Sequence, residues 1–357
     1  MTRGGRKPDG GAAPAFLTGY TALAEPRLAA FLDDRCAEAA RLPVDLRAPF
    51  AALREYVLRG GKRLRGALVV LGCEAAGGDR AWALDASIGM ELLHAYLLVH
   101  DDFMDRDEVR RGGPTLHSSL GRAAGSEHLG ASLAVLLGSL CEAWALELVL
   151  AAPVAPERSL AAGLLLARAL QDVTVGQMQD VSAPLGRELS PRDVLAVQRM
   201  KTGSYSFELP LRLGALLAGA GDALLEALGR FARPLGQAFQ IADDLLGTFG
   251  DPEVTGKPNA NDLREGKRTL LIARALESAD PRDAALLRAK LGRADLTNAE
   301  AAELRDVLER SGAAQACRDE AERLRAEAVG AVEGAPFPAR IAQALREIAA
   351  YGVRRAA

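Results

Sequence analysis

Helix-compatible segments follow one another along almost the whole chain, from about Phe16 to Tyr351, with only short breaks between them. Ala, Leu, Arg and Glu dominate these segments, β-branched runs are short, and aromatic residues make up only 4% of the chain. This composition favours helix, and 357 residues are enough to bury a large core. The pattern therefore predicts an all-α fold.

We expect a single domain, because no long linker rich in Ser or Gly separates the helical segments. Residues 1–15 lack the apolar core of a signal peptide and are expected to form a flexible tail, which leaves residues 16–357 as the domain. Capping residues mark several helix starts: Ser190-Pro191 with Asp193, Asp280-Pro281 with Asp283, and Thr297 with Glu300, whose helix should stop at Gly312. Two longer connections are expected over residues 112–125 and 250–266.

Charge and cysteine content narrow the class of partner. The net charge is -3 with acids and bases interspersed, so nucleic acid is not expected to bind. The four cysteines lie far apart, without CxxC or Cys/His spacing, which argues against a metal cage and a disulfide framework. No run reaches the roughly 18 to 20 uninterrupted apolar residues that a membrane span needs. We expect a cytoplasmic protein with buried, reduced thiols and no membrane span.

Three aspartates stand close together in the segment DDFMD, on a helix expected from about Ala83 to Asp107. At about 3.6 residues per turn, Asp101 and Asp105 share a face, and with Asp102 we expect three converging carboxylates. Such a cluster is either a solvated surface or a hard-cation site in which Mg²⁺ binds jointly with substrate phosphates. The preceding residues, ELLHAYLLVH, are apolar and helix-periodic, which favours the metal site.

A second acidic pair, Asp243 and Asp244, also ends an apolar helical run, AFQIADDLLGTFGD, with Gln240 one turn upstream. Two such pairs in similar contexts strengthen the metal interpretation. Basic clusters could balance the acids and bind diphosphates, although each alone is typical of a solvated surface. They are Lys62, Arg63 and Arg65 in GGKRLR, Arg110 and Arg111 in VRRGGPT, and Lys257 and Lys267 further on.

Together these motifs resemble the trans-isoprenyl diphosphate synthases, the polyprenyl synthase family, and most closely its bacterial geranylgeranyl-type members. The likeness covers most of the chain. The motifs occur in the family's order: GGKRLR from Gly60, ELLH ending at His94, HDDFMDRDEVRRGGPT from His100, GQMQD from Gly176, MKTGS from Met200, FQIADDLLG from Phe239, and GKPNANDLREGKRT from Gly256.

The resemblance implies an isoprenoid-synthase helical bundle with a central substrate cavity, a homodimer, and head-to-tail transfer of a prenyl group to isopentenyl diphosphate. It assigns three Mg²⁺ ions to Asp101, Asp102, Asp105, Asp243 and Asp244. It assigns the allylic diphosphate to Arg110, Lys201, Thr202, Gln240, Lys257 and Lys267. It assigns isopentenyl diphosphate to Lys62, Arg65, His94 and Arg111, and a polar network near the reacting carbons to Gln177 and Asp180.

Two positions depart from the family pattern. The residue after the last arginine of GGKRLR is usually Pro but here is Gly66, a change expected to affect the stiffness of the loop more than the chemistry. The second acidic motif commonly ends in Asp, whereas here Gly247 stands one turn beyond Asp243. One potential Mg²⁺ ligand is therefore missing, and weaker binding of one metal ion is the expected consequence.

Bulky residues upstream of the first acidic motif set the product length in this family. Tyr96 lies five residues before Asp101, about 7.5 Å down the helix axis, and resembles the pattern for geranylgeranyl diphosphate, with farnesyl diphosphate as the alternative. Tyr96 as an ordinary core residue is the other interpretation. His100 and His117 are expected to be structural, because the family mechanism needs no imidazole base.

Three other functions compete with this one. A class I terpene cyclase would need a second motif of the Asn-Asp, Ser/Thr, Glu type, and Asn261-Asp262-Leu263-Arg264-Glu265 lacks the hydroxyl at the required spacing. A regulatory partner subunit of a prenyl synthase usually loses one acidic motif, whereas both pairs are present here. A purely structural helical protein would not need these ordered acidic and basic motifs.

Overall fold

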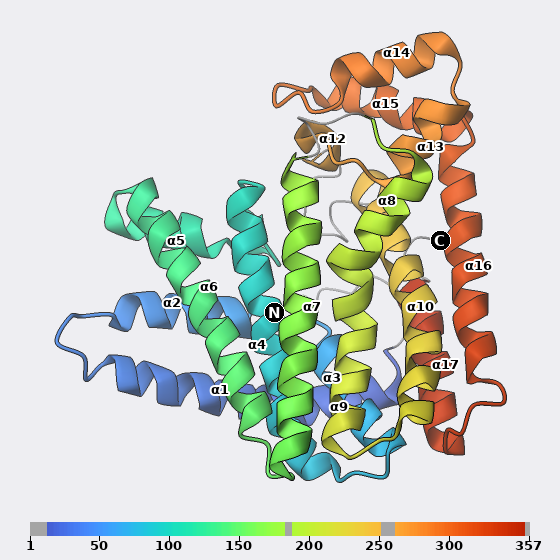
Figure 1. Ribbon diagram of the computed structural model, residues 1–357. Helices are drawn as coiled ribbons and strands as arrows, with labels where there is room; N and C mark the ends of the chain where they lie inside the picture. Colours follow the sequence, from blue (N-terminus) through green and yellow to red (C-terminus); the bar gives the residue numbers. More distant parts are fainter. Residues whose placement is uncertain (1–12, 183–187, 251–260, 354–357) are drawn as a thin grey trace, which may run out of the picture.

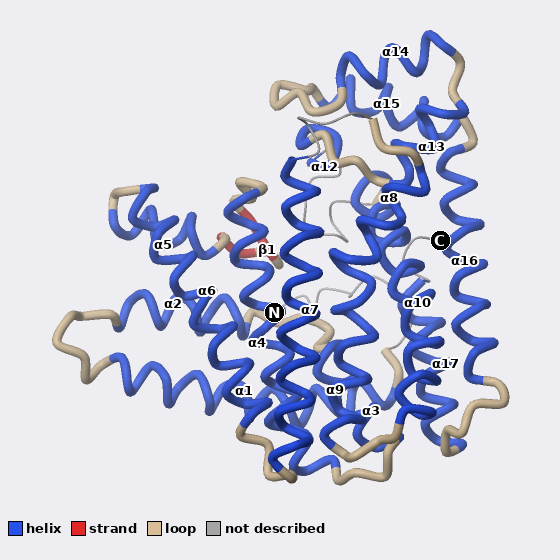
Figure 2. Tube along the Cα trace, in the orientation of Figure 1, coloured by secondary structure: helices blue, strands red, loops and turns tan. Residues whose placement is uncertain are grey.

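The computed structural model describes residues 13–182, 188–250 and 261–353, and these residues are mostly helical (Figures 1 and 2). The N-terminal half contains α1 (Ala15–Ala39), α2 (Arg47–Leu58), α3 (Leu64–Ala75), α4 (Arg80–Met104), α5 (Leu116–Ala124), α6 (Glu127–Leu150) and α7 (Pro156–Ser182). The C-terminal half contains α8 (Pro191–Gln198), the π-helical segment η2 (Arg199–Glu208), α9 (Leu209–Leu217), α10 (Asp222–Phe249), α12 (Asn261–Glu265), α13 (Leu270–Ser278), α14 (Pro281–Lys290), α15 (Asn298–Arg310), α16 (Ala313–Val332) and α17 (Ala339–Val353). The all-α prediction is confirmed.

The long helices α4, α7, α10 and α16 run along the length of the molecule, as Figure 1 shows. Helix α4 packs against α3 and α6, whereas α10 packs against α16 and η2. Helix α7 contacts η2 and α9, and so lies between the two groups. The short helices α12 to α15 gather at one end, at the top of Figure 1. This arrangement brings the ends of α4 and α10, which carry the acidic motifs, toward the same region.

Apolar side chains form the core on both sides of this region. One cluster joins α1, α2, α4 and α6, and another joins α10, α13, α15 and α16. A third lies between α3, α9, α10 and α17, where Leu68, Leu71 and Phe231 are fully buried. Ala and Leu supply much of this core, because small and branched aliphatic side chains let helices pack closely.

The helix starts predicted from capping residues are confirmed. Ser190 with Asp193 and Thr297 with Glu300 form capping boxes, and the Asp280 carboxylate accepts hydrogen bonds from two backbone amides of α14. Gly312 follows the end of α15 in a left-handed conformation, with a φ of 77°. Local chemistry was therefore sufficient to locate these boundaries.

Other predicted details were wrong. The connection expected over residues 112–125 contains helix α5, preceded by a two-residue antiparallel pair, β1 (Val109–Arg110) and β2 (Gly113–Pro114). The helix with the first acidic motif spans α4, so Asp105 caps its end and does not lie within it. All four cysteines are free and three are buried, but Cys36 is only half-buried. Most of the 250–266 connection, and the predicted tail up to residue 12, lie outside the described residues.

Helix α6 has the length and apolar composition of a membrane span, the only one with both among the described residues. Side chains in 39% of its most apolar window are buried within the protein, and the helix packs against α4 and α5. We predicted no membrane span, and among the described helices α6 is the one whose length and composition would allow it to be one.

Candidate active site

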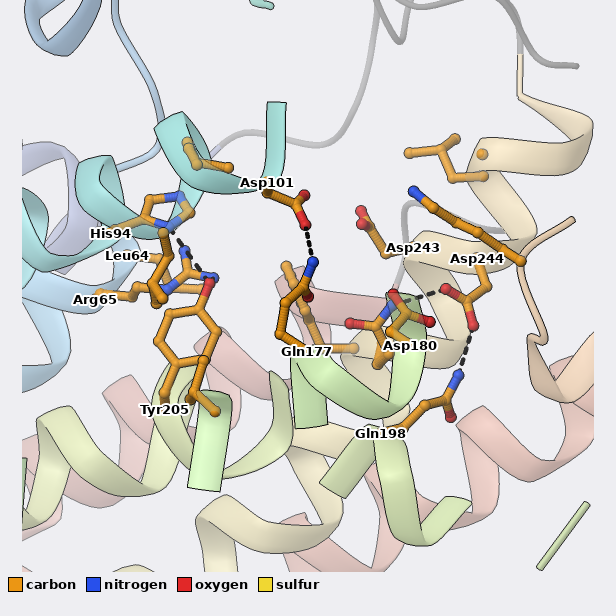
Figure 3. Close-up of a pocket in the computed structure, with 18 of the residues that line it drawn as sticks. Leu64, Arg65, His94, Asp101, Gln177, Asp180, Gln198, Tyr205, Asp243 and Asp244 are labelled. Atoms are coloured by element: carbon orange, nitrogen blue, oxygen red, sulfur yellow. Dashed lines mark hydrogen bonds between the residues drawn. The ribbon is translucent and has the colours of Figure 1, made fainter. Parts of the chain in front are cut away.

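A cavity of about 1750 Å³ opens between α3, α4, α7, η2, α10 and α12. Side chains from both acidic motifs and from the GGKRLR and VRRGGPT segments line it together, although they are far apart in sequence. Figure 3 shows Arg65, Asp101, Asp243 and Asp244 around this cavity. The predicted site residues that line it are Lys62, Arg65, His94, Tyr96, Asp101, Arg110, Arg111, Gln177, Asp180, Gln240, Asp243, Asp244 and Lys267. Lys257 and the side chains of Lys201 and Thr202 lie outside the described part of the chain.

In the first acidic motif, the adjacent carboxylates have different surroundings. Asp101 faces the cavity, where the side-chain amide of Gln177 on α7 donates to its Oδ1 at 3.1 Å (Figure 3). Asp102 is fully buried, and its oxygens accept hydrogen bonds from the Tyr56 hydroxyl at 2.7 Å and from Arg110 Nε at 2.6 Å. The expected convergence of three carboxylates is therefore only partial, because consecutive helix residues point in different directions.

The second acidic motif repeats this division between its two carboxylates. Asp243 is exposed to the cavity, whereas Asp244 is buried and accepts from the amides of Gln198 at 2.6 Å and Gln240 at 2.7 Å. Loss of surrounding water, and then the negative charge of Asp262, raise the pKa of Asp243, and the same two causes raise the pKa of Asp244 well above its ordinary value. Asp101, Asp243, Asp244, Asp262 and Glu265 thus form one side of the cavity, the acidic wall, where negative charges lie close together.

Lys267 connects the two sides of the acidic wall. Its ammonium lies 3.0 Å from Asp105 Oδ2, 3.5 Å from Asp262 Oδ1 and 3.0 Å from Glu265 Oε2. Desolvation acts to lower the pKa of Lys267, but the three carboxylates outweigh it and hold this pKa well above the ordinary value. Lys267 is therefore positively charged at neutral pH.

A cationic wall, made of Lys62, Arg65, His94 and Arg111, lies across the cavity, on α3, within α4 and in the adjoining loops. Arg65 donates to the hydroxyls of Tyr205 and Ser206, both at 2.8 Å, and its guanidinium lies over the Tyr205 ring. The Nε of Arg65 is buried and has no hydrogen-bond partner among the described residues. His94 Nδ1 lies 3.4 Å from the Tyr205 hydroxyl. Burial, and then the charge of Arg65, lower the pKa of His94 well below its ordinary value, so its imidazole is neutral.

Arg111 and Lys62 complete this wall near the GGKRLR loop. The Arg111 guanidinium donates to the Gly60 carbonyl at 2.5 Å and packs so close to Gly61 that a Cβ there would meet it at 3.1 Å. Gly60 and Gly61 both have positive φ, which suits glycine. The ammonium of Lys62 lies over the Tyr351 ring of α17. Lys62 of this loop and Arg111, between β1 and β2, thus place two cations at the cavity edge.

Gly66 is held by contacts that the sequence did not predict. Its backbone amide donates to Glu91 Oε1 at 2.8 Å, a hydrogen bond that proline could not make. A Cβ at this position would also overlap the Tyr20 hydroxyl of α1. The same Glu91 lies 3.6 Å from the buried Arg63 guanidinium, which donates to Glu25 at 2.7 Å. Arg63 therefore belongs to this buried network, which anchors the start of α3.

Apolar side chains line the cavity below Asp101. Tyr96, Leu97 and Leu98 of α4 contribute, together with Val173 of α7. The Tyr96 ring packs edge-on against His100, with ring centroids 4.6 Å apart, and His100 Nε2 lies within hydrogen-bonding distance, 3.0 Å, of the Val135 carbonyl. His100 is thus anchored to α6, in agreement with its predicted structural role.

Sequence reasoning missed several polar residues of this site. Tyr56 lies outside the quoted motifs, and Gln198 and Tyr205 only flank MKTGS, so the fold is what brings them to the acidic and basic groups. Asp262 and Glu265 were noticed as an incomplete cyclase motif, yet both line the cavity. Their position five and two residues before Lys267 was the signal that could have found them.

The donor set fits Mg²⁺ held jointly with a diphosphate. Within the described residues, no three Asp, Glu, His or Cys side chains are already grouped to hold a metal ion by themselves. Mg²⁺ commonly takes one or two carboxylates from the protein and the remaining oxygens from substrate phosphates and water. Asp101 and Asp243 offer carboxylates of this kind. Desolvation, and then the charge of Asp262, raise the pKa of Asp243, and a bound cation would stabilise its ionised form.

Comparison with known proteins agrees with this geometry. Residues 48–308 match the Polyprenyl synthetase family. A crystal structure of geranylgeranyl pyrophosphate synthase from Corynebacterium glutamicum, complexed with isoprenyl diphosphate and magnesium, superposes with a TM-score of 0.90 at 31% identity, covering 95% of this chain and 99% of that one.

Two curated relatives differ in product. Geranylgeranyl diphosphate synthase of Methanosarcina mazei is 35% identical over 64% of this chain and 67% of its own length. A (2E,6E)-farnesyl diphosphate synthase of Mycobacterium tuberculosis is 35% identical over 83% of this chain and 80% of its own. The chain belongs to the polyprenyl synthetase family of prenyltransferases. Members of this family join isopentenyl diphosphate to allylic diphosphates.

Proposed function

We propose that this chain is a Mg²⁺-dependent geranylgeranyl diphosphate synthase, which extends shorter allylic diphosphates with isopentenyl diphosphate to a C20 product. One observation carries the proposal: a single cavity has an acidic wall, a facing cationic wall and an apolar part lined by Tyr96. Two diphosphates and a hydrocarbon tail need these three environments. The magnesium and isoprenyl diphosphate in the similar Corynebacterium glutamicum structure support the same interpretation.

The acidic wall would bind the allylic diphosphate. Asp101, Asp105 and Asp243 would hold Mg²⁺, with three ions expected per site, while Asp102 and Asp244 are held by protein donors and position their neighbours. The cations and donors assigned to the same diphosphate are Arg110, Lys201, Thr202, Gln240, Lys257 and Lys267. When bound, Mg²⁺ would stabilise the negative charge that builds on the departing diphosphate.

The cationic wall would bind isopentenyl diphosphate through Lys62, Arg65, His94 and Arg111. The buried Nε of Arg65 is a donor that a diphosphate oxygen could satisfy. His94 is neutral because its pKa is lowered, so it can donate one hydrogen bond without adding another charge among these arginines. Two anionic substrates would then be held with their carbon chains side by side.

The reaction needs no protein nucleophile. Arg110 and Lys267 would stabilise the diphosphate as the allylic C–O bond breaks, and the double bond of isopentenyl diphosphate would attack the resulting cation. The released pyrophosphate would then remove the proton that completes the new alkene. Gln177 holds Asp101 in place, and Asp180 lines the cavity nearby. Leu97 and Val173 provide an apolar lining that excludes water from the cation.

Tyr96 would set the product length by forming the floor of the tunnel. It lines the cavity, and its ring is supported by His100, which α6 holds in place. A growing hydrocarbon chain would meet this aromatic ring and stop. Geranylgeranyl relatives favour the C20 product, while the mycobacterial relative keeps farnesyl diphosphate as the alternative.

A homodimer would bury the apolar surface of α6 and α7. These two helices pack against each other and expose several large apolar side chains. They are Leu129, Leu136, Leu140, Leu146 and Leu150 on α6, and Leu160, Leu164 and Val175 on α7. Exposed apolar patches of this kind mark interaction surfaces. Residues 16–357 would form the catalytic domain of each subunit, acting in the cytoplasm.

Dependence of turnover on the acidic wall tests the proposal. The purified chain should form a prenyl diphosphate product from isopentenyl and allylic diphosphates with Mg²⁺, and lose activity when the metal is chelated. Asp101→Asn should reduce the rate by about 100-fold or more, as expected for loss of electrostatic stabilisation at the leaving group. Turnover that is indifferent to both changes would refute the proposed role.

A further inference from the structure

The place where the second acidic motif lacks a carboxylate is filled from another helix. Gly247 lies one turn beyond Asp243 on α10, and a Cβ built on it would meet Asp262 Oδ2 at 2.5 Å. Asp262 belongs to α12, which packs against this part of α10. Its carboxylate therefore stands where a side chain at position 247 would begin.

The position of this carboxylate, beside Gly247 and at the cavity, is that of a missing motif residue. Positions 243 and 247 lie on the same face of α10, because residues four apart on a helix are neighbours. Asp243, Gly247 and Asp262 all line the cavity. The second carboxylate oxygen of Asp262 lies 3.5 Å from Lys267 Nζ, which also contacts Asp105 of the first motif. Asp262 thus lies between the two acidic motifs.

We propose that Asp262 supplies the carboxylate that the second acidic motif lacks at Gly247, and that it holds Mg²⁺ with Asp243 when a diphosphate is bound. The inference rests on the proposed function, because only a Mg²⁺–diphosphate site needs this ligand. Glycine at 247 leaves room for this placement, since a side chain there would force the Asp262 carboxylate to shift. The expected weakening of one metal position is compensated by α12.

Binding of inorganic pyrophosphate to the full chain, measured by calorimetry over a series of Mg²⁺ concentrations, tests this directly. Asp262→Ala and the size-matched Asp262→Asn should each raise the Mg²⁺ concentration for half-maximal binding by about tenfold or more. The double variant Gly247→Asp with Asp262→Ala moves the carboxylate back onto α10 and should recover most of the loss. Gly247→Asp alone should not improve binding, because two carboxylates would compete for one place.

Asp222→Asn serves as the matched control, since Asp222 is an exposed acid at the opposite end of α10 and should leave binding unchanged. If Asp262 only held Lys267 in place, its variants would weaken pyrophosphate binding equally at every Mg²⁺ concentration. That result, or wild-type behaviour of Asp262→Asn, would overturn the assignment of Asp262 alone. Absence of Mg²⁺-dependent binding and of product in the wild-type chain would overturn the proposed function as well.

Discussion

The Tyr56 hydroxyl donates a hydrogen bond to Asp102 Oδ2 at 2.7 Å, across the interface between α2 and the end of α4. The other Asp102 oxygen accepts from Arg110, so this buried carboxylate fixes the cation that we propose for the allylic diphosphate. Tyr56 therefore supports the site from outside the cavity, although no motif identifies it.

Replacing Tyr56 with Phe should weaken this support. We expect the free energy of unfolding to fall by about 1–3 kcal/mol, because a buried carboxylate loses a donor. The KM for the allylic diphosphate should rise more than the KM for isopentenyl diphosphate, since Arg110 is less firmly held. Urea denaturation and steady-state kinetics measure both effects.

Tyr20→Phe is the matched control for this variant, because Tyr20 is another buried tyrosine whose hydroxyl donates to Ser87 at 3.0 Å. It should lower stability without selective loss of allylic affinity. Equal changes in the two KM values for Tyr56→Phe would contradict the proposed support of Arg110.

Gly66 should be intolerant of any side chain. Gly66→Ala places a Cβ against the Tyr20 hydroxyl and the Ser87 carbonyl, and should destabilise the protein by about 1–3 kcal/mol through overpacking. Gly66→Pro should be worse, because it also removes the hydrogen bond to Glu91. Thermal unfolding compares them with Gly19→Ala on exposed α1 surface, which has no neighbour within 4 Å and should gain about 0.5–1 kcal/mol. Wild-type stability of Gly66→Pro would show that the Glu91 contact is unimportant.

Tyr96→Ala should lengthen the product by at least about one isoprene unit. Truncation removes the ring that narrows the apolar part of the cavity, while the acidic motif one turn later is unchanged. Mass spectrometry of the products gives the length distribution. Phe103→Ala, which removes an exposed aromatic ring from the same helix, should leave that distribution unaltered. An unchanged distribution for Tyr96→Ala would make Tyr96 an ordinary packing residue.

Glu265 should make the metal-free protein less stable as the pH rises. Burial raises the pKa of Glu265 to about 7 from its ordinary value of 4.5; Lys267 opposes this shift and Asp105 adds to it. The folded state therefore binds a proton that the unfolded state has already lost between these two values, so stability falls with pH across that window. Glu265→Gln should flatten this dependence in thermal unfolding curves recorded without Mg²⁺. An equally steep decline in the variant would assign it to another group.

Much of this molecule could be predicted from local signals. Helix caps such as Ser190 and Asp280 act within one turn, and the acidic and basic motifs carry their charge in a few adjacent residues. Periodicity also placed Asp101 and Asp243 at the ends of apolar helices, where the structure has them. These features depend on neighbours in sequence, which a single chain displays directly.

The remaining features depend on contacts between distant segments. Nothing adjacent to Tyr56 in sequence indicates that its hydroxyl contacts Asp102. Likewise, the sequence indicates a missing ligand at Gly247, and only the packing of α12 shows that Asp262 lies beside it. The division of each acidic pair into one cavity-facing and one buried carboxylate likewise needs the surrounding helices. The short α5 was missed because glycines and polar residues in its neighbourhood favoured a loop.

Product analysis of the purified chain tests the central claim most directly. Incubation with Mg²⁺, isopentenyl diphosphate and, separately, dimethylallyl, geranyl or farnesyl diphosphate should yield geranylgeranyl diphosphate as the main product from each primer. A product that ends at farnesyl diphosphate would contradict the C20 assignment and keep the chemistry. No product from any primer, with the protein folded and Mg²⁺ present, would contradict the synthase account itself and favour a partner subunit that works only with a second chain.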